Sequence, residues 1–454
     1  MKKGLLQFIL LAAPLMLPCS CSGGFQIEGE LDGSDAAGDI QADRADAGDP
    51  ADEDGTDAGD SAGDPMPDEP GAETVHDPLE DTSEPETVVD VPVEEVIEDV
   101  PEETTPPPAN RFGIGLVSPG NSGQWDLSYS LAGDGGYIKP IFPGVEPSMG
   151  SVPPEWVDAV SQIYSRTLIA VIRIGPPWGN MYVRNMSDGG SFTSYTEIAG
   201  KYSMVVEAVM PHVTAGWPIY FEIHNEPNLC YEWKCRTHEA PPHADTPEGW
   251  IHYSDTAHEY AYFLRDVADA LHDIGDARIH VINGGLAPGG TVTCQCDGDG
   301  GTPGITALEF IREMEIAVPD IWDRIDAWAT HSYPSSGLGW GFFDTYESCG
   351  PGLHFFENEL AETGRSFPVL ITETGWTISH EGHHWSRDQV SDFMISAWND
   401  PWLTHDDILG VMPFMLQDGA WDNFAWVDPG GTPYPVYNAV RNLRCSMGIP
   451  PACD

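Results

Sequence analysis

Between residue 111 and the end of the chain, short apolar runs alternate with longer stretches that place apolar residues three or four positions apart. The short runs are rich in β-branched and aromatic residues, which is typical of buried strands, and the longer stretches have the period of an amphipathic helix. Strands are expected at 112–117, 137–142, 168–174, 219–223, 279–282, 327–330, 369–372 and 408–415. Helices are expected at 155–165, 202–209, 257–272, 306–316, 352–362, 388–398 and 437–443.

This alternation predicts one α/β domain, because strands joined by helical crossovers run parallel and the crossovers are right-handed. Eight such units would close into a (β/α)8 TIM barrel, and residues 111–454 have a suitable length for one. The loops after Pro227 and Pro334 are long. Long loops at the carboxyl ends of barrel strands usually shape a binding cleft, so we expect the functional site at that end.

The pattern is different over residues 1–20. Two lysines follow Met1, and residues 5–17 form an apolar run that is too short for a transmembrane helix. Cys21 follows a small serine, and the segment resembles a bacterial lipoprotein signal peptide, in which the cysteine after the cleavage point is lipidated. We therefore expect a lipid anchor on Cys21 as the only link to a membrane. An ordinary secretory signal is the alternative.

Residues 21–110 have neither pattern. They are rich in Asp, Glu, Pro, Ala and Gly, as in Asp43-Arg44-Ala45-Asp46, and almost lack aromatic residues. Such a segment cannot bury enough apolar surface to offset chain entropy, so we expect a disordered acidic linker, extended by its charges and prolines. The net charge of the whole chain is −54, which argues against nucleic acid as a partner.

The cysteines are compatible with export. The expected barrel holds seven of them, and six can pair in an oxidising compartment. Cys445 and Cys453 lie close enough along the chain for a local disulfide at the C-terminus, while the pairing of the others is left open by the sequence. A metal site built on the cysteines is disfavoured, and we expect neither a metal nor a cofactor.

Two of the expected strands end in a glutamate that is followed at once by a turn residue. Glu226 follows the strand at 219–223 and precedes Pro227, and Glu373 follows the strand at 369–372 and precedes Thr374-Gly375. In a parallel barrel the carboxyl ends of the strands form the catalytic face. Two carboxyl groups at that face are what cleavage of a glycosidic bond requires.

The segments Asn225-Glu226-Pro227 and Thr372-Glu373-Thr374-Gly375 resemble the acid/base and nucleophile motifs of clan A glycoside hydrolases, with the flavour of families 5 and 39. This resemblance covers 111–454. It implies that Glu226 is the acid/base, which must hold its proton, and that Glu373 is the ionised nucleophile. It also implies that Asn225 binds the 2-hydroxyl of the sugar.

Further candidates for substrate binding follow from the same resemblance. His331 and Tyr333 lie after the sixth strand, where the histidine would contact sugar hydroxyls and the tyrosine would donate to Glu373. Trp421 would form the floor of the subsite beside the scissile bond. Apart from the resemblance, Trp376 is a candidate for a further subsite, with packing in the core as the alternative. Family 5 places an arginine at the end of the second strand, whereas this chain has Arg173 at the end of the third.

Together these features predict an exported, lipid-anchored retaining glycoside hydrolase that cleaves β-linked polysaccharide. Long loops and several tryptophans favour endo-action on a glucan, mannan or xylan. An exo-β-glycosidase or transglycosylase on the same fold is an alternative, and a non-catalytic carbohydrate-binding surface lipoprotein is another. We expect a monomer in the bacterial cell envelope, sorted to the outer membrane and exposed at the surface, or otherwise secreted.

Overall fold

The computed structural model describes residues 106–118, 120, 123–177, 183–233, 253–287, 306–334, 352–380 and 383–453. Outside these residues lie the expected signal peptide, the expected lipidation site Cys21 and almost all of the expected linker. All three remain predictions. In the part of the chain that is described, no helix is both long and apolar enough to cross a membrane.

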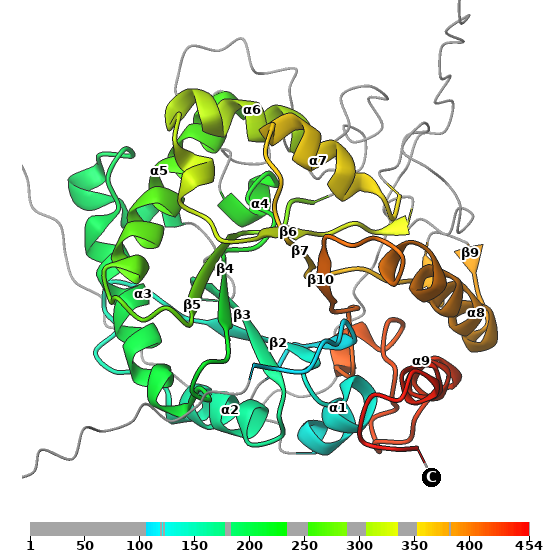
Figure 1. The fold of residues 1–454 in the computed structure, drawn as a ribbon. Coiled ribbons are helices and arrows are strands. Elements are labelled where there is room, and N and C mark those ends of the chain that lie inside the picture. Colours follow the sequence, from blue (N-terminus) through cyan, green and yellow to red (C-terminus); the bar gives the residue numbers. More distant parts are fainter. Residues whose placement is uncertain are drawn as a thin grey trace, which may run out of the picture. The chain divides into compact units, whose positions relative to one another are not determined.

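Eight parallel strands in the described residues form the centre of the fold (Figure 1). They are β1 (Gly113–Leu116), β2 (Tyr137–Pro143), β3 (Ile169–Gly175), β4 (Ile219–Ile223), β5 (Ile279–Asn283), β6 (Trp328–Thr330), β7 (Val369–Ile371) and β10 (Ile408–Val411). A short antiparallel hairpin of β8 (Ser379–His380) and β9 (His383–His384) lies outside this set.

The strands close into a barrel. Strands β1 to β5 pair in chain order, and β6, β7 and β10 pair as a second group, all in parallel. Single parallel bridges join the two groups on both sides, from Ile282 to Ala327 and from Phe112 to Val411. The expected (β/α)8 barrel is therefore present.

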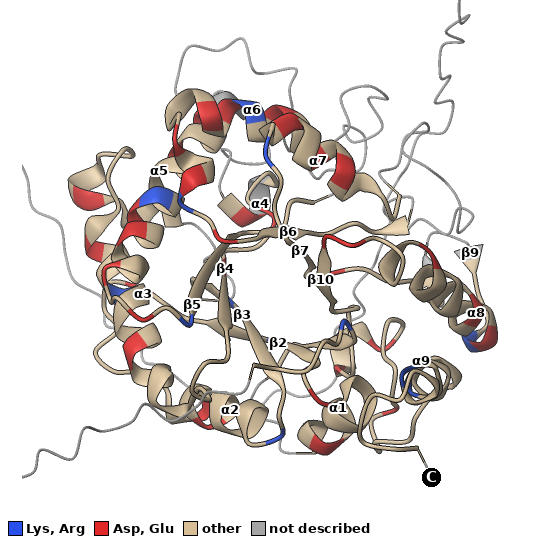
Figure 2. Ribbon diagram, in the orientation of Figure 1, with Lys and Arg blue, Asp and Glu red and all other residues tan. Residues whose placement is uncertain are grey.

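Helices surround the barrel (Figure 1). They are α1 (Gln124–Ala132), α2 (Pro154–Tyr164), α3 (Thr196–Val209), α4 (Cys230–Trp233), α5 (Tyr253–His272), α6 (Ala307–Ala317), α7 (Phe355–Thr363), α8 (Arg387–Ala397) and α9 (Pro435–Ser446). Short 3-10 segments are η1 (Val183–Met186), η2 (Asp188–Gly190), η3 (Met210–His212), η5 (Ile321–Asp323) and η8 (Gly419–Trp421), and η7 (Trp398–Trp402) is a π turn. Figure 2 shows acidic residues recurring along α3, α5, α6 and α7.

The core lies between the barrel and its helices. All residues of β3 and β4 are buried, as expected for parallel strands that are covered on both faces. Phe142 of β2 stacks on Trp156 of α2 at 4.8 Å, and Phe112 stacks on Trp398 at 4.2 Å between ring centroids. Charged residues of the strands are buried as well, which is costly unless each is paired.

Most expected elements agree with the structure to within a few residues, and the exceptions have local causes. Helix α1 was not expected, because polar residues break its apolar period and Ser128 is buried by donating to the carbonyl of Gln124 at 2.7 Å. The expected strand 408–415 ends at Val411, because Pro413 has no N–H with which to continue a regular ladder. Single hydrogen bonds to both neighbours continue beyond it, from Gly115 N to the carbonyl of Pro413 at 3.0 Å and from Phe414 N to the carbonyl of Thr374 at 2.9 Å. The predicted Cys445–Cys453 disulfide is confirmed.

Candidate active site

The two candidate glutamates meet at the carboxyl ends of the barrel strands. Glu226 follows β4 and Glu373 follows β7, so 147 residues of chain separate them. One carboxylate oxygen of each lies within 4.8 Å of the other. Glu373 is 9% exposed and Glu226 is partly exposed, so both border the open end of the barrel.

The turn that carries Glu226 has an unusual backbone. His224 has a φ of 77° and Glu226 a φ of 36°, a left-handed region that residues with a side chain rarely adopt. The segment after β5 holds this turn in place. Glu226 N donates to the carbonyl of Gly285 at 3.0 Å, and Asn228 exchanges two hydrogen bonds with the backbone of Ala287. Strain of this kind persists where surrounding contacts fix it, and it gathers at functional sites.

Glu373 is held as an anion by two donors. Lys139 Nζ of β2 lies 3.1 Å from Glu373 Oε1, and the Tyr333 hydroxyl donates to Oε2 at 3.2 Å. Burial by itself raises the pKa of Glu373, but the charges of Lys139, His331 and Arg173 outweigh it and lower that pKa below its ordinary value. The expected contact between Tyr333 and Glu373 is thus present.

A third glutamate, Glu222 of β4, lies fully buried beside the pair. Its carboxylate accepts from Thr372 Oγ1 at 2.8 Å and from Gly285 N at 3.1 Å, and it pairs with Lys139 Nζ at 2.9 Å. Burial raises the pKa of Glu222, yet Lys139 and His331 more than offset this and hold that pKa well below the usual range. Glu222 therefore remains charged and fixes the lysine that contacts Glu373.

His331 lies among these carboxylates rather than at the sugar-binding surface. Its Nδ1 is 2.9 Å from Glu226 Oε1 and its Nε2 is 3.3 Å from Glu222 Oε1, and the side chain is fully buried. Burial lowers the pKa of His331, but the nearby glutamates, Glu373 first, raise it to about 9. The expectation that His331 contacts sugar hydroxyls is corrected, because both ring nitrogens face glutamates of the protein.

Sequence reasoning missed Lys139 and Glu222. A charged residue inside an apolar strand was the available signal, since Tyr137-Ile138-Lys139-Pro140-Ile141 and Ile219-Tyr220-Phe221-Glu222-Ile223 each contain one. Lys139 is on the second strand, the strand at whose end family 5 has an arginine and this chain has none. The other cation, Arg173 of β3, is buried and its charge acts on Glu373.

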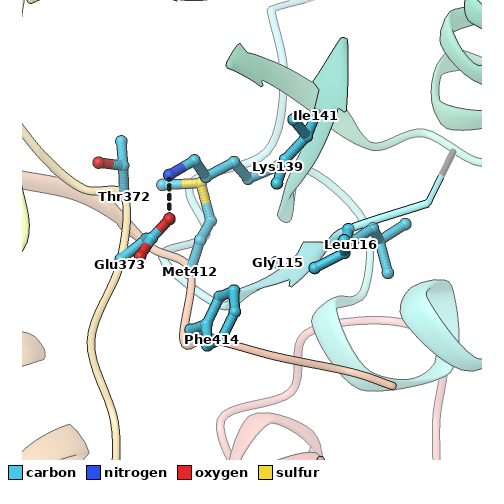
Figure 3. A pocket seen from close by; sticks show the side chains of 9 residues that line it. Gly115, Leu116, Lys139, Ile141, Thr372, Glu373, Met412 and Phe414 are labelled. Carbon is cyan, nitrogen blue, oxygen red and sulfur yellow. Dashed lines mark hydrogen bonds and ion pairs between the residues drawn. The ribbon is translucent and has the colours of Figure 1, made fainter. Parts of the chain in front are cut away.

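A pocket lies beside Glu373 (Figure 3). Its lining comes from β1, β2, β7, β10 and the segments that follow them, and consists of Gly115, Leu116, Val117, Lys139, Ile141, Thr372, Glu373, Met412 and Phe414. Figure 3 shows Lys139 reaching Glu373, with Met412 and Phe414 nearby. Phe414 forms an aromatic wall of the pocket, and no sequence motif indicated it.

The two candidate tryptophans differ in their placement. Trp421 is 49% exposed and packs edge-on against Phe414, with 5.8 Å between ring centroids, so its indole extends the aromatic wall of the pocket. Trp376 is only 4% exposed and packs against Phe393 in the hydrophobic core. Of the two alternatives for Trp376, packing in the core is the one present, and the role in a subsite is corrected, because a buried indole offers no face for a sugar ring.

Glu226, His331 and Glu373 are close enough together to hold a metal ion. Their donor chemistry does not fit one. Both ring nitrogens of His331 already face glutamate oxygens of the protein, at 2.9 Å from Glu226 and 3.3 Å from Glu222. Glu373 and these two carboxylates raise the pKa of His331, which favours the doubly protonated ring that has no lone pair for a metal. The ammonium of Lys139 already neutralises Glu373. The cluster is better suited to hydrogen bonds between the His331 ring and the surrounding carboxylates than to metal coordination.

The site therefore has two carboxyl groups that face each other across a short distance and differ in their surroundings. Glu373 has a lysine and a tyrosine as donors, which favours its ionised form. Glu226 has one imidazole donor and is more exposed. A nucleophile and a proton carrier can thus reach neighbouring atoms of one bound molecule.

Neither a family model nor a curated protein matches the sequence. Among solved structures, a family 39 glycoside hydrolase from Bacteroides cellulosilyticus is 17% identical, with a TM-score of 0.47 over 73% of this chain and 63% of that one. This chain thus spans less than two thirds of that protein. A broad-specificity endoglucanase from Clostridium acetobutylicum is 11% identical, with a TM-score of 0.47 over 73% and 96% of the chains. A β-glycosidase is 12% identical, with a TM-score of 0.48 over 76% and 98%.

These proteins are glycoside hydrolases, the class that the two glutamate motifs resemble.

Proposed function

We propose that this chain is a retaining glycoside hydrolase that cleaves β-linked polysaccharide by double displacement. The observation that carries the proposal is the distance between carboxylate oxygens of Glu226 and Glu373, which is within 4.8 Å. Retaining enzymes hold their carboxyl groups about 5–5.5 Å apart, whereas inverting enzymes leave about 6.5–9.5 Å for a water molecule. The short gap supports attack by a side chain of the protein.

In the first step the Glu373 carboxylate attacks the anomeric carbon while Glu226 donates its proton to the leaving oxygen. In the second step Glu226 takes a proton from a water molecule. The water oxygen then bonds to the anomeric carbon, the bond from that carbon to Glu373 breaks, and the sugar is released. The Tyr333 hydroxyl and Lys139 hold Glu373 in position for attack. The His331 N–H holds Glu226 and keeps positive charge near the pair throughout.

Asn225, next to Glu226, is proposed to bind the hydroxyl at carbon 2 of the reacting sugar. Trp421 and Phe414 offer aromatic faces against which a sugar ring can stack. A polymer is the proposed substrate, because the expected signal peptide and the expected acidic linker would carry the domain out of the cell, toward material too large to enter it. Endo-action is proposed because long loops and several tryptophans favour a cleft with more than one subsite.

The decisive experiment is product analysis of the purified protein on β-glucans, mannans and xylans, with the anomeric configuration of the first product followed by NMR. We expect a β-configured product from a β-linked chain and a ladder of oligomers. A monomer or transfer product would indicate exo-action or transglycosylation. An α-configured first product would contradict the assignment of Glu373 as nucleophile.

A matched pair of variants separates catalysis from binding. Glu373→Gln should reduce turnover by at least about 1000-fold while polysaccharide binding is retained, because the nucleophile is lost but the shape is kept. Glu359→Gln replaces another buried glutamate, which accepts from Trp328 Nε1 at 2.9 Å, and should retain turnover. Binding with no turnover in the unchanged protein would favour a carbohydrate-binding lipoprotein.

The anchoring proposal has its own test. We propose that Cys21 is lipidated and that the protein is carried to the outer membrane. Cells that produce the chain are fed radiolabelled palmitate, and the label should enter the unchanged chain and the Cys19→Ala variant but not Cys21→Ala. Label retained in Cys21→Ala would show that this cysteine is not the anchor.

A further inference from the structure

One more buried carboxyl group lies at the site, and neither the sequence motifs nor the two-step mechanism uses it. Glu232 is on α4, six residues after Glu226, and is 7% exposed. Its Oε1 accepts a hydrogen bond from Asn225 Nδ2 at 3.1 Å. Its Oε2 is buried and has no hydrogen-bond partner among the described residues. This contact with Asn225 is the only hydrogen bond of its side chain that the described residues provide.

The short helix α4 holds Glu232 firmly in place. Trp233, the next residue, is fully buried and packs against His224 at 5.3 Å and Tyr260 at 5.4 Å between ring centroids. The backbone N–H groups of Glu232 and Trp233 both donate to the carbonyl of Leu229 at 3.1 Å. The carboxylate thus approaches Asn225 from a segment that is anchored in the core.

The charges around Glu232 tie it to the catalytic pair. Burial raises its pKa to about 7, with Arg173 acting in the opposite direction and Glu226 and Glu373 adding to the rise. A carboxyl group buried beside two catalytic carboxyls is destabilising by itself. The charge of Arg173 and the hydrogen bond to Asn225 offset this cost.

We propose that Glu232 is a positioning residue that fixes the amide of Asn225, and through it the contact with the hydroxyl at carbon 2 of the sugar. This inference rests on the proposed glycosidase function. The terminal torsion of an asparagine side chain is broad, so an amide without a fixed partner samples several orientations. An acceptor on Nδ2 selects one of these orientations before the substrate binds.

The contact to the 2-hydroxyl strengthens in the transition state of glycosidases, so its loss lowers turnover more than binding. Glu232→Met keeps the length of the side chain but removes the acceptor, and Glu232→Gln keeps an acceptor oxygen. We expect Met to lower kcat/KM by about 10- to 100-fold, the effect of one hydrogen bond to a charged group. We expect Gln to restore most of the activity.

The test compares substrates with and without the 2-hydroxyl. The probes are the 2,4-dinitrophenyl β-glucoside, mannoside and xyloside, each with its 2-deoxy counterpart, assayed on the full chain. Glu232→Met should lose activity on the sugar that the unchanged protein cleaves and change by less than about twofold on the 2-deoxy form, since no hydroxyl is there to be held. Glu359→Met is the matched control and should leave the ratio between the two substrates unchanged.

The outcomes are distinct. Equal losses on both substrates, or no loss on either, would overturn the positioning role. Should the Met variant fail to fold, Glu232→Asp withdraws the carboxylate by one methylene and must show the same dependence on the 2-hydroxyl. If the unchanged protein cleaves neither the aryl glycosides nor the polysaccharides, the proposed function fails, and this inference fails with it.

Discussion

Lys139 Nζ lies 3.1 Å from Oε1 of Glu373, although 234 residues of chain separate them. The lysine belongs to β2 and is only 2% exposed, so water cannot replace it as the partner of the carboxylate. It also pairs with Glu222 at 2.9 Å. One ammonium group therefore pairs with both Glu373, the proposed nucleophile, and the fully buried Glu222.

Replacing Lys139 should impair both stability and catalysis. In Lys139→Met, Glu222 and Glu373 lose their shared cation, and removing one partner of a buried ion pair destabilises a protein by about 3–5 kcal/mol. The same change raises the energy of the ionised nucleophile, so we expect kcat to fall by about 100-fold or more. Urea unfolding and turnover on an aryl glycoside measure the two effects.

Lys201→Met is the control for this prediction. Lys201 is partly buried and its Nζ donates to the carbonyl of Met149 at 2.9 Å, outside the carboxylate cluster. We expect normal turnover in this variant. Equal kinetics for both lysine variants would mean that Lys139 has no special part in holding Glu373.

The charge on His331 predicts how stability depends on pH. Because folding raises its pKa to about 9, the folded state favours the protonated ring. This contribution is complete below the unfolded pKa of about 6.5 and is lost as pH rises through about 9. A shift of this size corresponds to on the order of 3 kcal/mol. Urea midpoints measured from pH 6 to 9.5 should fall in the unchanged protein.

In His331→Gln that fall should be much smaller, since the titrating group is absent. The exposed His212 provides the comparison, because His212→Gln removes a histidine without touching the carboxylates. A pH dependence that persists in His331→Gln would assign it to other groups.

Gly285 has a steric role under the imidazole of His331. A Cβ built on Gly285 would lie 2.5 Å from Nε2 of that ring, closer than real contacts allow. In Gly285→Ala the ring must move away from Glu222 and Glu226, and a displacement of about 1 Å at such a site lowers turnover by about 100-fold. Turnover of an aryl glycoside and a crystal structure of the variant would measure the two changes.

Gly200 in α3 is the matched position for this test. A Cβ there meets nothing within 4 Å, so Gly200→Ala should stabilise the helix by about 0.5–1 kcal/mol and leave turnover unchanged. Normal activity in Gly285→Ala would show that the ring of His331 tolerates displacement.

Trp421 should contribute to substrate binding without contributing much to stability. Its ring is half exposed and packs edge-on against Phe414, which lines the pocket at Glu373. Loss of a stacking face is worth about 0.5–1.5 kcal/mol, so Trp421→Ala should raise KM by about 2- to 10-fold with little change in kcat. Phe192, another exposed aromatic residue, provides the control variant Phe192→Ala. An unchanged KM in Trp421→Ala would remove this residue from the site.

The fold and the proximity of the two candidate glutamates could be predicted from local patterns. The alternation of apolar runs and helical stretches identified the barrel strands, because burial on both faces requires an almost continuous apolar run. Glu226 and Glu373 stood out since each ends such a run before a turn, and parallel strands bring their carboxyl ends to one face. Proximity along the chain was also enough to predict the Cys445–Cys453 disulfide.

The partners of these groups were decided only by the tertiary structure. Glu222 meets Thr372 across 150 residues and Lys139 meets Glu373 across 234, and no local pattern encodes such pairs. The directions of His331 and Trp376 depend on how the strands and loops pack. This packing places His331 among carboxylates and Trp376 in the core. The sequence determined which segments become strands and where their last residues lie, since burial and turn formation are local. The closing of the barrel determined which charges neutralise one another, since electrostatic pairing depends on distance in space.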